Sequence, residues 1–151
     1  MGKNPVKRVM LSLCALVSVG LLSGVPVRAH HAFAAEFDAN RPVKVTGTLA
    51  KVEWVNPHSW FHIDVKMPDG KVERWMFEGG GPGSLTRRGF TKRSIPLGTE
   101  LVLEGYMSKG APRRANARLM TFTDGRMLFV GSSGTGAPDD GRDPTETKKP
   151  Q

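Results

Sequence analysis

Four histidines, His30, His31, His58 and His62, are the residues of this chain best suited to chemistry. The first two are adjacent in the stretch VRAHHAF, and what they can do depends on whether the chain is cut just before them. A new terminus at His30 would carry an α-amino group with a pKa of about 7.7 to 8.0 beside an imidazole. Amine and ring nitrogen of one residue can chelate a metal ion, and Cu(II) favours such tetragonal nitrogen sites.

One further nitrogen would complete a T-shaped copper site. His31 offers a second binding mode through the amine, the intervening amide and its ring. His58 and His62 are four residues apart on one predicted strand, about 13 Å from each other, so both can bind one ion only if the segment Asn56-Pro57-His58 bends back. His58 lies at the end of that strand and is the better partner. The candidate metal ligands are therefore His30, His31 and His58, with copper as the candidate cofactor. The alternative is a chain without a metal site, with two histidines at a flexible terminus and two on a solvent-facing strand.

The first 29 residues have the pattern of a cleaved signal peptide. A basic start, Met1–Arg8, precedes an apolar run of about 14 residues, which is shorter than the roughly 20 needed to cross a membrane. Val27 and Ala29 place small residues at the −3 and −1 positions of a cleavage site. We therefore predict cleavage after Ala29 and a periplasmic or secreted protein without stable membrane insertion; an uncleaved membrane anchor is the alternative.

Cleavage changes the charge and the thiol content of the chain. It removes four basic residues, Lys3, Lys7, Arg8 and Arg28, and lowers the formal net charge from +8 to +4. A nucleic-acid partner is therefore not expected. Cys14, the one cysteine, leaves as well. This excludes a disulfide, an iron–sulfur cluster and a cysteine nucleophile in the remaining protein.

The elements that must position these histidines are predicted to be strands. Apolar residues alternate from Val43 to Leu49 and then slip in phase to Val52, which indicates a β-bulge in a long first strand. Two more strands follow around the turn Met67–Gly70, then a connection with a short helix near Ser84–Arg88 that Ser84 could cap. Two or three further strands complete an all-β fold. This order predicts a small OB-like barrel, closed or partly open, of five to six strands; an open sandwich competes with it.

Residues 30–131 are predicted to form this single barrel domain. From residue 132 the chain reads SSGTGAPDDGRDPTETKKPQ, with no large apolar side chain. Such a segment cannot bury enough surface to offset its ordering entropy. Residues 132–151 are therefore predicted to be a disordered tail.

Two further sets of side chains are candidates for binding. Exposed aromatic rings beside polar groups favour a ligand-binding groove, with cross-strand packing of the tryptophans as the alternative. Its predicted residues are Trp54, Asn56, Trp60, His62 and Trp75. A basic cluster after the loop GGGPGS favours anion binding, with solvated surface charge as the alternative. Its predicted residues are Arg87, Arg88, Lys92 and Arg93.

Several motifs together resemble a family of small exported bacterial proteins. They are HHAFAAEFDANRPV, KVEWVNPHSWFHIDV, WMFEGGGPGSLTRRGFT and GYMSKGAPRRANAR, which span about residues 30 to 131. Members typically read AHHSFAAEFD followed by KVEWxNPH. The resemblance implies export and a small β-domain, but the family is known only as a domain of unknown function and transfers no catalytic residue. Ala32 departs from the pattern, where a serine is expected.

No catalytic motif is present: the serines lack a GxSxG setting, and the glutamates are scattered along strands. We therefore expect a non-catalytic binding or accessory protein of the periplasm, whose partner is another periplasmic protein or a small ligand. The alternative is a protein that binds or delivers copper through His30, His31 and His58.

Overall fold

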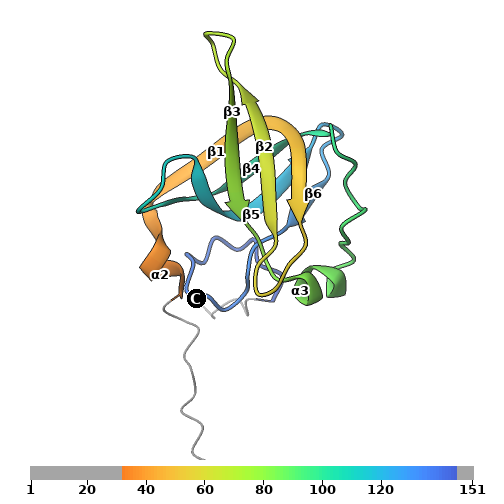
Figure 1. The fold of residues 1–151 in the computed structure, drawn as a ribbon. Coiled ribbons are helices and arrows are strands. Elements are labelled where there is room, and N and C mark those ends of the chain that lie inside the picture. Colours follow the sequence, from red (N-terminus) through yellow and green to blue (C-terminus); the bar gives the residue numbers. More distant parts are fainter. Residues whose placement is uncertain (1–31, 146–151) are drawn as a thin grey trace, which may run out of the picture.

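The computed structural model describes residues 32–145 of the 151 (Figure 1). His30 and His31, the predicted signal peptide and the last six residues lie outside this range. Two short helices and six strands occur in the order α2 (Ala32–Glu36), β1 (Phe37–Glu53), β2 (Trp60–Lys66), β3 (Val72–Glu78), α3 (Pro82–Arg87), β4 (Glu100–Ser108), β5 (Arg114–Phe122) and β6 (Met127–Phe129).

The strands close into a ring of hydrogen bonds. The sheet runs β3-β2-β1-β4-β5-β6, and β3 also pairs with β5, so the strands β1, β2, β3, β5 and β4 form a barrel. All pairings are antiparallel except β3 with β5. A short helix lies between β3 and β4. This confirms the predicted OB-like barrel and excludes the open sandwich, because a sandwich leaves strand edges that this ring has paired.

A β-bulge bends the long first strand as its sequence predicts. Leu49 faces Ile63 on β2 and Lys51 faces His62, which leaves Ala50 as the extra residue. The bulge turns Val52 back to the interior, where 9% of it is exposed. One strand can therefore pair with β2 along its second half and with β4 along its first half.

The predicted turns are present, but the helix cap is not the predicted one. Gly70 closes the β2–β3 hairpin with φ 83° and donates its N–H to the carbonyl of Met67. Helix α3 starts at Pro82, and Gly81 is its N-cap, without a side-chain cap. The prediction that Ser84 caps this helix is wrong, since proline at the first position starts the helix earlier.

The core fills the barrel with apolar side chains from all five strands of the ring. Leu101 and Leu103 of β4 point inward and are at most 1% exposed, as their alternation predicts. Leu85 of α3 and Phe90 after it close one end of the core. Other members at 0% exposed are Leu49, Phe61, Ile63, Phe77, Ala115, Ala117, Met120 and Val130.

Helices α2 and α3 lie at the same end of the barrel, and the chain after β6 runs across this end (Figure 1). Residues 132–145, within the segment predicted to be disordered, contain no helix or strand, and they contact both α2 and the barrel. Thr135 accepts a hydrogen bond from the Phe33 N–H at 3.3 Å, and Pro138 accepts one from Arg118 at 3.1 Å. Both of these contacts are polar, in keeping with a segment that has no large apolar side chain.

Candidate functional site

The loop between β1 and β2 carries His58 and is held against the end of β3. The Ser59 N–H donates to the Gly80 carbonyl, and the Gly79 N–H donates to the Ser59 carbonyl, which extends the β2–β3 ladder beyond both strands. A Cβ on Gly79 would lie 2.6 Å from the Phe61 ring and 2.8 Å from the Val130 carbonyl oxygen. Glycine in the loop GGGPGS thus permits this close approach of backbone to barrel.

The ring of His58 is oriented through its Nδ1 atom. Nδ1 lies 3.3 Å from the carbonyl oxygen of Gly79, 3.3 Å from the Ser132 hydroxyl and 3.6 Å from a carboxylate oxygen of Glu78. A proton on Nδ1 would donate to these acceptors, and the lone pair on Nε2 would then be available. Metal-ligating histidines are commonly held in this way by a carbonyl or carboxylate.

A buried carboxylate links His58 to an arginine. Glu78 is 9% exposed, and burial, opposed by the charges of His58 and Arg114, raises its pKa. The Arg114 guanidinium lies 3.0 Å from Glu36 of α2 and 3.6 Å from Glu78, and it stacks over the Trp60 ring at 4.7 Å. Through Arg114, these ion pairs connect Glu36 of α2 to Glu78 of the barrel, beside His58.

These side chains surround a small cavity, which we call the His58 pocket. Its volume is about 40 Å³, enough for one water molecule or a small ion. It is lined by Phe33, Glu36, Phe37, His58, Glu78, Asn116, Ser132 and Thr135. Asn116 is 4% exposed, and its Oδ1 atom accepts no hydrogen bond from the described residues. The pocket therefore joins the start of the described chain, at Phe33, to His58.

The predicted groove residues are not brought together on one surface. Trp60 and His62 share the outer face of β2, where His62 is 7% exposed and its Nε2 lies 3.0 Å from Glu53. His62 is thus covered rather than solvent-facing. Trp54 and Trp75 pack against the core, where Trp54 lies tilted against Phe90 and Trp75 stacks on Phe77. Asn56 is exposed on the loop before His58.

The predicted anion-binding residues also separate. Arg87, Lys92 and Arg93 are exposed around α3 and the loop after it. Arg88 instead donates to the Gly131 carbonyl and the Ser133 hydroxyl, and it stacks over the Phe129 ring at 4.8 Å. Burial lowers the pKa of Arg88. This arginine anchors the chain after β6 and does not join the other three.

The described residues alone do not form a metal centre. No three histidine, cysteine, aspartate or glutamate side chains within residues 32–145 converge on one point. His30 and His31, two of the three predicted ligands, lie outside that range, while His58 is in place.

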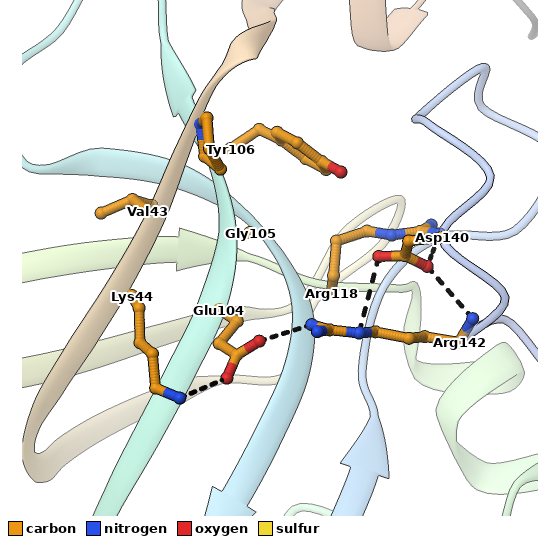
Figure 2. A pocket seen from close by; sticks show the side chains of 9 residues that line it. Val43, Lys44, Glu104, Gly105, Tyr106, Arg118, Asp140 and Arg142 are labelled. Atoms are coloured by element: carbon orange, nitrogen blue, oxygen red, sulfur yellow. Dashed lines mark hydrogen bonds and ion pairs between the residues drawn. The ribbon is translucent and has the colours of Figure 1, made fainter.

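Sequence reasoning missed a second cavity on the outside of the barrel, shown in Figure 2. This Tyr106 cleft has a volume of about 380 Å³ and is lined by Pro42, Val43, Lys44, Glu104, Gly105, Tyr106, Arg118, Asp140 and Arg142. Arg118 is only 1% exposed and pairs with Asp140 at 2.9 Å. The sequence did offer a signal for this cleft, because Arg118 interrupts the apolar strand pattern ANARLMTF.

None of the helices in the described part of the chain is long and apolar enough to span a membrane.

No curated protein matches this sequence. The family of unknown function DUF6152 matches residues 16–116, about two thirds of the chain. The match includes the long bulged strand, His58 and the strands that hold it. The chain therefore belongs to the family of unknown function DUF6152.

Proposed function

We propose that this protein is an exported, non-catalytic binding protein of the periplasm, and that its ligand is Cu(II). The signal-like first 29 residues support export, and cleavage after Ala29 would make His30 the first residue. The α-amine and ring of His30, the backbone or ring nitrogens of His31 and the ring of His58 form the proposed ligand set. Binding or delivery of copper is the proposed activity.

The observation that carries this proposal is that Phe33 and His58 line the same pocket. His31 and His30 precede Phe33 by two and three residues. Because a residue spans at most about 3.3–3.6 Å, His30 lies no further than about 11 Å along the chain from Phe33. The two N-terminal histidines therefore have the reach to meet His58.

The environment of His58 supports a ligand role rather than acid–base catalysis. Its Nδ1 atom already faces the Gly79 carbonyl and Glu78, so Nε2 is the nitrogen left for a metal. The Glu78 carboxylate is in turn shared with Arg114. These partners hold the imidazole in one orientation, which favours a fixed ligand over a group that must exchange protons with a substrate.

The test requires the authentic N-terminus. The protein is expressed with its own first 29 residues, the terminus is confirmed by mass, and Cu(II) is titrated with EPR detection. We expect one copper per chain in a tetragonal nitrogen environment. The dipeptide Gly-Pro placed before His30 moves the amine away from the imidazole and adds a proline without an amide N–H, so no new chelate forms and Cu(II) affinity should fall by at least about tenfold.

His58→Gln should weaken Cu(II) binding and remove one nitrogen from the spectrum. His62→Gln is the matched control, because its ring is covered and bound to Glu53 on the outer face of β2. Equal affinity of the wild type and the Gly-Pro-extended protein would reject the N-terminal chelate. Equal loss in both histidine variants would reject His58 as the third ligand.

A further inference from the structure

The Tyr106 cleft contains a buried cation, Arg118, which lies at a β-bulge of β5. On the β4–β5 pairing Glu104 faces Leu119 and Gly105 faces Ala117, so Arg118 is the extra residue of a bulge. A Cβ on Gly105 would lie 1.7 Å from the carbonyl oxygen of Asn116, so only glycine permits this approach. Bulges redirect side chains, and this one turns Arg118 to the outside of the barrel, beneath the chain after β6.

A carboxylate from the same chain forms an ion pair with the guanidinium of Arg118. Asp140 accepts a hydrogen bond from it at 2.9 Å, and the Pro138 carbonyl accepts another at 3.1 Å. The Phe129 ring lies 4.8 Å from the guanidinium carbon. Asp140 belongs to residues 138–143, which we call the strap, and the strap has neither helix nor strand. Few backbone bonds therefore oppose its release.

The rest of the cleft is suited to a small organic anion. Release of the strap removes Asp140 and Arg142 together, and two cations, Lys44 and Arg118, then face one carboxylate, Glu104, so the exposed cleft is positively charged. Tyr106 adds a phenol, and burial, followed by the nearby Asp140 charge, raises the pKa of Tyr106. The phenol thus stays protonated and can donate. Pro42 and Val43 supply an apolar wall next to these polar groups.

We infer that the Tyr106 cleft binds a small carboxylate with a compact apolar body, and that this carboxylate takes the place of Asp140 on Arg118. A planar guanidinium binds a carboxylate through two parallel hydrogen bonds, so the ligand can replace the internal partner with the same geometry. The volume of about 380 Å³ is at the lower end of small-molecule sites. The cleft shares no lining residue with the His58 pocket, so this inference stands apart from the copper proposal.

The test is an NMR titration of the full chain with benzoate, with benzamide as its neutral counterpart. Benzoate should bind with a roughly millimolar Kd and shift the amide signals of Gly105, Tyr106 and Arg118, whereas benzamide should leave them in place. Asp140→Asn weakens the internal competitor and should tighten benzoate binding about three- to tenfold. Asp139→Asn is the matched control, because this neighbouring carboxylate bonds only to the Gly141 N–H within the described chain and should leave affinity unchanged.

Arg118→Gln should abolish benzoate binding, and its melting temperature shows whether the barrel still folds. If Arg118→Gln does not fold, the benzoate affinities of Asp140→Asn and Asp139→Asn test the inference instead. Shifts elsewhere on the barrel, equal binding of benzamide, or an equal effect of both aspartate variants would overturn the inference.

Discussion

The ring of Phe33 packs edge-on against the ring of Tyr106, with their centroids 5.5 Å apart. Phe33 lines the His58 pocket and Tyr106 lines the cleft under the strap, so one aromatic contact joins the two candidate sites. Phe33 is 3% exposed and also lies 5.7 Å from the ring of Phe37. It therefore fastens α2, and with it the start of the described chain, to the barrel.

Phe33→Ala should detach α2 and weaken both the fold and the proposed copper site. Loss of a buried phenylalanine costs about 3 kcal/mol, measured by urea unfolding. Cu(II) affinity should also fall, because the residues before Phe33 would no longer be held beside His58. Leu97→Ala, at a side chain that is 65% exposed, should change the free energy of unfolding by no more than about 0.5 kcal/mol. Equal stability of the two variants would contradict the anchoring role.

Gly105→Ala should disrupt the bulge that places Arg118. The added Cβ would lie 1.7 Å from the Asn116 carbonyl oxygen, which is backbone and cannot turn aside. We expect a loss of about 3 kcal/mol or more in urea unfolding, with shifted amide signals along β5. Gly110→Ala is the control, because nothing lies within 4 Å of a Cβ there. A stable Gly105→Ala protein with an unchanged β5 would show that the bulge tolerates a side chain.

The stability of the protein should depend on pH through Glu104, which pairs with Arg142 of the strap. The hydrogen bond from Lys44, followed in effect by those from Arg142, lowers the pKa of Glu104 below its ordinary 4.5 in spite of partial burial. A carboxyl whose pKa is lower in the folded state stabilises the fold above its unfolded pKa. That stabilisation is lost as the pH falls through the lower folded value.

Glu104→Gln should therefore reduce stability at pH 7 by about 0.5–1 kcal/mol, because solvent reaches both cationic partners, whose side chains are 69% (Lys44) and 42% (Arg142) exposed. The difference from wild type should close as the pH falls through the lowered folded pKa of Glu104. Urea unfolding at a series of pH values from 7 downwards measures this difference. Glu100→Gln, at an exposed glutamate of the same strand that forms no ion pair within residues 32–145, should show no such dependence. A difference that persists at low pH would rule out the ion pairs as its cause.

Asp140→Asn should weaken the attachment of the strap to the barrel and so increase its rate of cleavage by trypsin. Arg142 offers a trypsin site within the strap, and its cleavage requires the strap to leave the barrel. Because opening is governed by the free energy of that release, we expect cleavage after Arg142 to be about three- to tenfold faster than in wild type. Asp139→Asn should be cleaved at the wild-type rate. Equal protection in all three proteins would place the anchor of the strap elsewhere.

Local sequence patterns determined the elements of this fold. The phase slip after Leu49 located the bulge of β1, the residues Met67–Gly70 formed the predicted hairpin, and alternation placed Leu101 and Leu103 inside. These features depend on neighbours within a few residues, so periodicity and turn chemistry suffice to find them. The order of the elements then indicated an OB-like barrel.

Long-range contacts decided what the side chains do. Whether Arg118 faces water or Asp140 depends on a bulge opposite Gly105 and on a segment 22 residues further along the chain. The position of Phe33 and His58 around one pocket depends on the pairing of β3 with β5, which closes the barrel. The sequence by itself therefore determined the strands, the turns and the candidate ligand types. Only the tertiary structure decided which of them meet, because burial and charge pairing arise between residues that no local pattern connects.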